Sequence, residues 1–573
     1  MKTVQQRIEE ICCQAFENAG FDRDLGEVRT SDRPDIADYQ CNGLLAAAKK
    51  YKLNPRKAAD DLLPGLQSPD LFSVDVVGPG FLNFTVAGTA LAEQTRAALD
   101  DPRALVPVID QPQKFLVDYG GPNIAKDMHV GHLRSAIVGQ TICNILRFAG
   151  HTVVGDVHLG DWGLQIGQLI AQIEDEAPDL LEPEGKTSLD MSDLQTWYPR
   201  ASARSKDDQD FLDRARVATA DLQAGQAAYM SLWQRIRDVS SQSLLRDYGR
   251  LGVSFDQWYG ESRYQDDLEE ITKDLLDEGT AEVDDGAVII RMPDELDLPP
   301  LILQNSKGSF GYGSTDLATI ADRLRHDDPD IILYVVDARQ KTHFQQVFKA
   351  AERAGFLTKT HLEHIAFGTV NGTDGKPFKT RAGGVMRLQD LLDNMSAAAK
   401  VRLDEVGQIT GPLSETVAEE IATAAIKFGE LIHDRESNYV FDVEQFLRFE
   451  GKTGPYLQYS IVRLRSLLSR AADAGLNPGD LVEFDQRGRQ LALRLGEFPA
   501  TFERAVEKRK PNIIAHFAFD LANAANSFYQ SNQILGSTTE DSVKRSHLRL
   551  LEAANHSLSV CCGLLGLAIP KEM

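Results

Sequence analysis

Residues 114–163 read KFLVDYGGPNIAKDMHVGHLRSAIVGQTICNILRFAGHTVVGDVHLGDWG. The apolar residues 115–117 predict a strand that ends at Asp118, and a glycine-bearing loop follows at 120–123. The tetrad His129-Val-Gly-His132 then opens an amphipathic helix pattern that runs to residue 148. A strand, a glycine-bearing loop and a helix N-terminus form the arrangement that binds phosphate groups.

The tetrad itself favours nucleotide chemistry without the lysine of a P-loop. The imidazoles of His129 and His132 can donate hydrogen bonds to a triphosphate, and Gly131 lets a nucleobase or a backbone approach closely. Four residues alone are a weak signal, because histidines near a helix start also serve as caps or core residues. The strand before the tetrad and the helix after it supply the context that such a motif needs.

The pattern outside this stretch predicts a doubly wound parallel sheet. Strand and helix patterns alternate over residues 115–119, 133–150, 152–158 and 162–171. The apolar run 331–336 predicts a central parallel strand, and 362–367 predicts another. Residues 177–210 are polar and predict an irregular insertion, and 211–251 predict one long helix.

Three domains follow from the changes in pattern along the chain. Residues 1–108 predict a small α/β domain, with helices over 4–19, 42–51 and 55–63 and strands over 72–77 and 81–86. Residues 109–413 predict the Rossmann-like α/β domain, entered through a proline-containing linker. Residues 414–573 are almost wholly helical in pattern, so we expect an all-α C-terminal domain there.

The composition excludes several classes of protein. Of the 573 residues 42% are hydrophobic and 25% charged, which is ordinary for a soluble globular protein. The six cysteines fit neither a disulfide framework nor a zinc site, which favours a reducing compartment. The first 16 residues predict an amphipathic helix rather than a secretory signal, and no apolar run is long enough to cross a membrane. We therefore expect a cytoplasmic protein with no membrane partner and no structural metal.

Net charge is the feature that fits a nucleic acid partner least. The formal charge is -24, and phosphate backbones attract Lys and Arg. The charge is uneven, however, because residues 441–573 hold 16 Lys and Arg against 15 Asp and Glu. A near-neutral C-terminal region is compatible with a local basic surface.

The sequence resembles one family in several separate segments. Residues 118–135, DYGGPNIAKDMHVGHLRS, resemble the signature of class I aminoacyl-tRNA synthetases, and specifically of the arginyl-tRNA synthetases. The segment HLGDWG at 158–163 is similar to a second signature of that family. The resemblance runs over nearly the whole chain and implies ATP-dependent attachment of arginine to its tRNA, through an arginyl-adenylate, at the 2′-hydroxyl of the terminal adenosine.

An arginine site needs acids and hydrogen-bond acceptors for a planar cation. Three segments offer such groups, at residues 260–262, 312–318 and 337–340. An isolated acid is more often a surface or capping residue, but the segments occur together and in the family's order. The resemblance implies that Glu261 and Asp316 contact the guanidinium and that Tyr312 packs beside it. Tyr312 and Asp316 are four residues apart, which places them on one face of a helix. The remaining implied arginine-binding residues are Gln340 and Asn123 at the polar end of the amino acid, and Asp118 nearby.

The nucleotide site implied by the resemblance binds ATP with Mg²⁺ through His129, Gly131, His132 and Lys379. Class I enzymes carry a mobile KMSK loop, and GKPFKTRAGG at 375–384 stands in its place without that literal sequence. Lys379 and Arg381, with Lys376, provide a cationic clamp between glycines. In arginyl enzymes with this degenerate loop, a lysine just ahead of the histidine tetrad is thought to compensate, and Lys126 stands there. The residues expected to act in catalysis are His129, His132, Lys126, Lys379 and Arg381.

The tRNA-binding residues are implied by the C-terminal region. Residues 451–465, GKTGPYLQYSIVRLR, resemble the opening of the family's helical anticodon-binding domain. Tyr456, Tyr459 and Arg463 are suited to stacking on unpaired bases, although either tyrosine could instead be a core residue. In the family the N-terminal domain contacts the corner of the tRNA.

We therefore expect an arginine-specific, ATP-dependent class I enzyme that acts on tRNA as a monomer. Two alternatives stay open. Another nucleotidyltransferase with the same histidine tetrad is disfavoured by Glu261, Asp316 and the all-helical C-terminal region. A tRNA-binding relative without catalytic activity is disfavoured by the intact His129 and His132 and by the cation-bearing loop.

Overall fold

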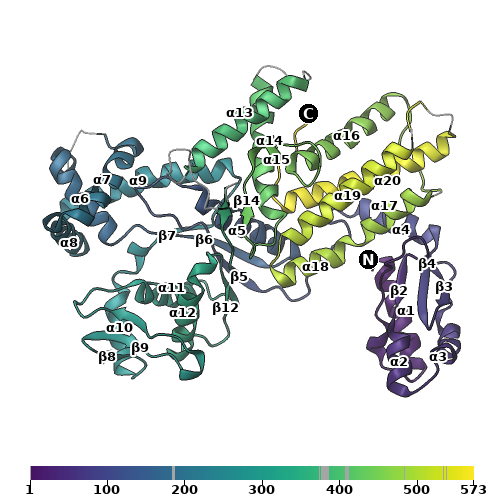
Figure 1. The fold of residues 1–573 in the computed structure, drawn as a ribbon, viewed down its shortest axis with the longest axis horizontal. Coiled ribbons are helices and arrows are strands. Elements are labelled where there is room, and N and C mark those ends of the chain that lie inside the picture. Colours follow the sequence, from purple (N-terminus) through teal and green to yellow (C-terminus); the bar gives the residue numbers. More distant parts are fainter. Residues whose placement is uncertain are drawn as a thin grey trace. The chain divides into compact units, whose positions relative to one another are not determined.

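The computed structural model describes residues 2–182, 188–372, 375, 386–406, 412–482, 484–532, 534–536 and 539–573. The chain forms two compact units, which we describe separately. The sheet unit comprises Ile109–Val406 with Ser414–Leu447, and the terminal unit comprises Met1–Val108 with Arg448–Met573. Figure 1 labels most of their strands and helices.

Five parallel strands form the main sheet of the sheet unit, in the order β12-β11-β5-β6-β7. Their bounds are β5 Lys114–Asp118, β6 Thr152–Leu159, β7 Gln257–Gly260, β11 Ile331–Tyr334 and β12 His361–His364. The first strand, β5, lies in the middle. The chain adds β6 and β7 on one side of it and β11 and β12 on the other, so the order reverses between β5 and β11. This confirms the predicted doubly wound parallel sheet, in which ligands bind beyond the carboxyl ends of the strands at the reversal.

Helices α5, α11 and α12 surround this point. They span Val130–Ala149, Tyr312–His326 and Lys341–Arg353. Leu116 of β5 and Ile332 of β11 join Leu317 of α11 and Val347 of α12 in one buried apolar cluster. A second, antiparallel sheet contributes to the same cluster, with β8 Glu282–Asp284, β9 Ala287–Ile290 and β10 Leu301–Gln304. The strand ends that carry the site are thus fixed by a core beneath them.

Two expectations about the insertion were wrong in detail. Residues 177–210 are not irregular, because α7 spans Met191–Asp207 within them. Asp190 caps this helix by accepting hydrogen bonds from the backbone N–H groups of Ser192 and Asp193. The expected single helix over 211–251 is two helices, α8 Gln209–Gln223 and α9 Ala227–Arg250. The break falls at Gly225, whose φ of 81° is accessible to glycine and ends the first helix.

The remaining elements of the sheet unit are helical apart from one short strand pair. The helices are α6 Leu164–Glu176, α10 Asp267–Asp277, α13 Leu388–Val406, α14 Pro412–Leu431 and α15 Val443–Phe446, and the pair is β13 Val370–Asn371 with β14 Tyr439–Val440. Helix α14 provides two buried charges. Glu430 accepts a hydrogen bond from Arg134 of α5 at 2.8 Å, and Lys427 donates to the carbonyl of Leu251 at the end of α9, also at 2.8 Å.

The terminal unit joins the two ends of the chain. Its antiparallel sheet has the order β1-β2-β4-β3, with β1 Arg29–Thr30, β2 Tyr39–Cys41, β3 Phe72–Val77 and β4 Phe81–Val86. The helices are α1 Val4–Asn18, α2 Gly43–Tyr51, α3 Pro55–Leu62, α4 Gly88–Asp100, α16 Gly454–Asp473, α17 Gln486–Gly496, α18 Phe498–Lys508, α19 Asn512–Ser531 and α20 Asp541–Leu564. Arg489 of α17 donates its Nε–H to Asp38 at 3.1 Å, which ties the N-terminal and C-terminal parts together.

None of the helices within the described residues is long and apolar enough to cross a membrane. In the same residues no group of three or more His, Cys, Asp and Glu side chains is placed to hold a metal ion.

Candidate active site

The Ser135 hydroxyl connects the two loops at the reversal point of the sheet. It accepts a hydrogen bond from the backbone N–H of Gly120, beyond β5, at 2.9 Å, and donates one to the carbonyl of Val335, beyond β11, at 2.7 Å. Gly120 has a φ of 89°, which permits the turn that follows β5. The loops that carry the candidate residues are therefore fastened to the first turns of α5.

His129 and His132 form a reciprocal cap at the start of α5. The backbone N–H of Gly131 donates to Nδ1 of His129 at 3.0 Å, and the backbone N–H of His129 donates to Nδ1 of His132 at 3.2 Å. The two rings stack with their centroids 3.9 Å apart. Because each Nδ1 accepts a hydrogen bond, a neutral ring carries its proton on Nε2. Both histidines thus present Nε2–H donors at the N-terminus of a helix.

The charge state of these rings fits hydrogen bonding better than acid catalysis. Burial, together with nearby Lys126, lowers the pKa of His129. Burial lowers the pKa of His132 to about 3, with His129 and Lys126 adding to the effect. Both rings are therefore neutral near pH 7. At Gly131 a Cβ atom would lie 2.7 Å from Cε1 of His129, so the glycine makes room for the first imidazole.

Lys126 and Asn123 lie in the loop ahead of the tetrad. The Lys126 ammonium is 3.4 Å from Oε1 of Gln165 and 4.5 Å from the ring centroid of Tyr198. Asn123 pairs with Gly160 through the backbone, and a Cβ at Gly160 would lie 1.9 Å from the Asn123 side-chain oxygen. The glycine of the HLGDWG segment thus allows the Asn123 amide to sit against it.

Asp118 is engaged by the chain's own Arg323. In the sheet register Asp118 lies opposite Tyr334 of β11 and Asp156 of β6. The Arg323 guanidinium, from α11, donates to Asp118 at 2.7 Å and to Asp156 at 2.6 Å. Burial raises the pKa of both carboxyls, and Arg323 opposes this shift. Asp118 is thus held by an internal ion pair beneath the predicted arginine site.

Glu261 lies just beyond the carboxyl end of β7, and the carboxylate of Asp161 stabilises the turn that contains it. Asp161 is fully buried and accepts hydrogen bonds from the backbone N–H of Ser262 at 2.9 Å and from its hydroxyl at 2.8 Å. Among the described residues we find no hydrogen-bond or ion-pair partner for the Glu261 carboxylate. Burial and the charges of Asp161 and Asp316 raise the pKa of Glu261 to about 8. An unpaired acid among acids is poised to accept a cation.

Tyr312 and Asp316 lie on the first two turns of α11, as the four-residue spacing predicts. Tyr312 is 69% exposed, and partial desolvation of its hydroxyl, with the charges of Glu261 and Asp316, raises its pKa. Oδ2 of Asp316 lies 2.5 Å from Nε2 of His343 on the first turn of α12. Asp316 also acts electrostatically on Glu261 and Asp118, so these three acids share one neighbourhood.

Gln340 is exposed at the start of α12. The preceding turn is capped by Asp337, which accepts from the backbone N–H of Arg339 at 2.8 Å. Gln340 is therefore displayed at the carboxyl edge of β11, on the same helix as His343. The structure thus brings to one edge of the sheet the two histidines, the loop with Asn123 and Lys126, and the acid cluster.

Known proteins of one family match the sequence of this chain along its length. The model of the class I (R) tRNA synthetase catalytic domain matches residues 95–443, the arginyl tRNA synthetase N-terminal domain matches 2–86, and the DALR anticodon binding domain matches 457–573. An arginine–tRNA ligase of Maricaulis maris is 43% identical, and one of Hyphomonas neptunium is 41% identical. Each alignment covers 100% of both chains.

The chain belongs to the class I arginyl-tRNA synthetases. Solved structures agree at the level of the fold. The arginyl-tRNA synthetase of Plasmodium falciparum superposes with a TM-score of 0.82 at 23% identity, covering 100% of both chains. That of Thermus thermophilus gives 0.78 at 23% identity, covering 99% of this chain and 100% of the other.

The predicted clamp of this synthetase lies outside the described residues, because Lys376, Lys379 and Arg381 fall in a stretch that the structure does not describe. The residues immediately after that stretch are described, and their backbone contacts the residues beside His129. The backbone N–H of Val130 donates to Met386 at 3.2 Å, and that of Leu388 donates to Met128 at 2.8 Å. Residues 386–388 therefore pair with the start of the tetrad.

The predicted tRNA-binding residues of the synthetase share one face of α16. Tyr456 is half-buried, and its hydroxyl donates to Asn523 at 2.6 Å. Tyr459 is 40% exposed, with its ring beside that of Phe449. The Arg463 guanidinium lies 4.7 Å from the ring centroid of Tyr529. Tyr459 and Arg463 thus present aromatic and cationic groups at the surface, whereas Tyr456 is fastened by hydrogen bonds.

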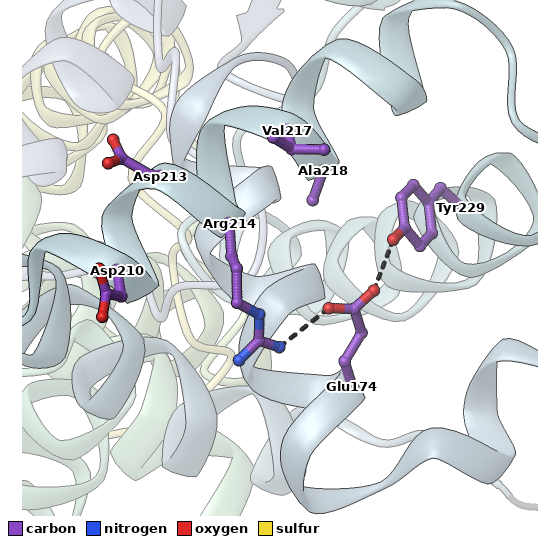
Figure 2. Close-up of a pocket in the computed structure, with 7 residues that line it drawn as sticks. All are labelled: Glu174, Asp210, Asp213, Arg214, Val217, Ala218 and Tyr229. Carbon is purple, nitrogen blue, oxygen red and sulfur yellow. Dashed lines mark hydrogen bonds and ion pairs between the residues drawn. The ribbon is translucent and has the colours of Figure 1, made fainter.

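A surface pocket of about 420 Å³ lies elsewhere in the synthetase, among α6, α8 and α9. Figure 2 shows Glu174 between Arg214 and Tyr229; it accepts a hydrogen bond from Arg214 at 3.0 Å and another from the Tyr229 hydroxyl. None of the predicted site residues lines this pocket. Glu174 is already paired with Arg214, so the edge of the sheet is the better candidate for arginine.

Sequence reasoning missed the residues that support the site. Asp161 belongs to the quoted HLGDWG segment but was assigned no role. Arg323 and Asp156 lie at positions whose partners come from distant segments. His343 follows Gln340 by three residues, a spacing that places both on one helix face and could have pointed to it.

Proposed function

We propose that this arginyl-tRNA synthetase activates arginine and transfers it to tRNA at the carboxyl edge of the main sheet. The observation that carries the proposal is Glu261, a partly buried and unpaired carboxyl beside Asp316. A guanidinium can supply the missing charge to both acids, with planar N–H donors that match carboxylates. Tyr312 flanks the guanidinium, and Asn123 and Gln340 bind the amino and carboxyl groups. Asp118 supports this site through Arg323.

In the first step an oxygen of the arginine carboxylate attacks the α-phosphorus of ATP. The bond to the bridging oxygen breaks, and pyrophosphate leaves. His129 and His132 donate their Nε2–H groups to phosphate oxygens, where negative charge accumulates. Lys126 adds a cation ahead of the tetrad, and we assign the cationic clamp to Lys379 and Arg381, as the resemblance implies. Mg²⁺ enters with ATP as part of the substrate and is bound chiefly by its phosphates.

In the second step the 2′-hydroxyl oxygen of the terminal adenosine attacks the carbonyl carbon of the adenylate. AMP leaves, and the hydroxyl proton is released. We assign tRNA binding to the predicted C-terminal region 414–573, through Tyr459, Arg463 and Tyr456, and to the N-terminal region 1–108, with 109–413 as the catalytic domain. We expect the enzyme to act as a monomer.

The proposal is tested by tRNA charging and by ATP–pyrophosphate exchange, each measured with every standard amino acid. Of the standard amino acids only arginine should be attached to the tRNA. Asp316→Asn should raise the KM for arginine about tenfold, because a charged contact exceeds a neutral one by on the order of 1–3 kcal/mol. Charging of a different amino acid, or an unchanged arginine KM in Asp316→Asn, would remove the acid cluster from this role.

A further inference from the structure

The contact between α11 and α12 places a histidine behind the Asp316 carboxylate. Asp316 lies on the second turn of α11 and His343 on the first turn of α12, with Nε2 2.5 Å from Oδ2. Both side chains are partly buried, at 26% and 29% exposure, so water competes weakly for this bond. The ring of Phe344 lies edge-on to the imidazole, 5.6 Å between centroids.

We propose that His343 is a positioning residue for arginine: it fixes one oxygen of Asp316, so that the other is directed to the substrate guanidinium. The inference rests on the proposed function and adds a residue that touches Asp316 rather than the substrate. A free aspartate on a helix surface samples several side-chain rotamers. A carboxylate held through Oδ2 presents Oδ1 in a defined direction, and ordering that is already present in the free protein is not lost on binding.

The charges around Asp316 explain why it needs such support. Asp118 repels its carboxylate, Glu261 does so in its ionised form, and Tyr312 and Tyr334 face it with neutral hydroxyls. His158 also faces it, but burial lowers the pKa of that ring, so it is neutral near pH 7. Arg323 is engaged with Asp118 and Asp156. His343 supplies a hydrogen-bond donor to the Asp316 carboxylate, and in its protonated form a cation as well.

His343 is suited to this task in both of its charge states. The hydrogen bond with Asp316 raises the pKa of His343, so the imidazolium persists to higher pH than in a free histidine. After deprotonation, a neutral ring with its proton on Nε2 still donates to Oδ2. The direction of Asp316 is therefore kept while the charge behind it changes.

Gln340 extends the argument to the other end of the substrate. It is the N-cap residue of α12, three residues before His343, so the two side chains emerge near the same end of one helix. In the proposed site Gln340 binds the polar end of arginine while His343 orders the acid that binds its guanidinium. One helix thus sets the distance between the two ends of the substrate, which favours a side chain of the length of arginine.

The test compares His343→Ala and His343→Gln in the full-length protein. The glutamine keeps an N–H donor of similar reach and cannot titrate. We expect His343→Ala to raise the arginine KM about tenfold, since a charge-assisted hydrogen bond orders its acceptor, with kcat changed less than about twofold and an unchanged KM for ATP. His343→Gln should recover the arginine KM to within about threefold of the wild type.

His361→Ala is the matched control, because His361 is exposed at the opposite, amino end of β12. It should behave as the wild type. An unchanged arginine KM in His343→Ala, or a loss of kcat and thermal stability that glutamine does not restore, would overturn the positioning role. A wild-type enzyme that does not charge arginine would instead refute the proposed function, so the two failures are distinguishable.

Discussion

Glu261 should make arginine binding depend on pH. Its pKa of about 8 in the free protein means that roughly one molecule in ten is ionised at pH 7 and roughly one in a hundred at pH 6. The guanidinium binds the ionised form and lowers this pKa, so binding expels a proton. Affinity should therefore rise roughly tenfold per pH unit below pH 7 and level off above pH 8.

Glu261→Gln removes the titration and the charge together. Above pH 8 the variant should bind arginine roughly 100-fold more weakly than the wild type, because it loses a charge-assisted contact worth about 3 kcal/mol. Near pH 6 the difference should nearly vanish, because there the wild type must first ionise a protonated acid. His343 is retained in the variant, so any dependence of arginine affinity on pH that persists is attributed to the titration of His343.

Calorimetric titration with arginine between pH 6 and pH 9, in two buffers of different ionisation enthalpy, measures both quantities. The wild type should release close to one proton per arginine at pH 7 and the variant close to none. A wild-type affinity that is independent of pH over this range, with no proton release, would refute the idea that Glu261 is protonated in the free protein and ionises when arginine binds.

Three further predictions concern other groups of the sheet unit. His129→Ala or His132→Ala should slow adenylate formation on the order of 10²-fold in rapid-quench assays, and the pKa of about 3 for His132 predicts that this ring contributes no pH dependence between pH 6 and 8. Glu430→Ala leaves Arg134 buried and unpaired and should lower the free energy of unfolding by roughly 3–5 kcal/mol in urea titrations, whereas Arg134→Met with Glu430→Leu should cost far less. Burial lowers the pKa of Lys427 to about 8 from 10.5, so the unfolded chain binds more protons between these values and stability should rise with pH across that window. Lys427→Met should abolish this rise and raise the melting temperature at pH 7. A melting temperature that the substitution leaves unchanged at every pH would contradict the prediction.

The fold was predictable where one local signal dominates. Apolar runs bounded by polar residues marked β5, β6 and β11, and the alternation with helices predicted their parallel order. The break between α8 and α9 was missed because helical periodicity continues on both sides of Gly225. Helix α7 was missed because polar composition outweighed the capping residues at Asp190 and Asp193, which the sequence does contain.

The candidate site was predictable only in part, for a different reason. The histidines are close in sequence, so their reciprocal cap follows from a single motif. The ion pair that engages Asp118 joins residues 205 positions apart, and no local pattern marks Arg323 as its partner. The state of Glu261 likewise depends on Asp161 and Asp316, whose proximity is set by the packing of α11 against the strand ends.

The central place of β5 affects how the protein can be made. Lys114, at its start, donates its backbone N–H to Asp330, 216 residues later, and β11 follows directly. While the ribosome is still producing the intervening segments, β5 can pair with β6 but keeps its other edge open. An open edge of a hydrophobic strand is a template for intermolecular pairing, so nascent or prematurely terminated chains should be prone to aggregation until β11 emerges. The same long-range closure means that no N-terminal fragment ending before residue 331 can assemble the site.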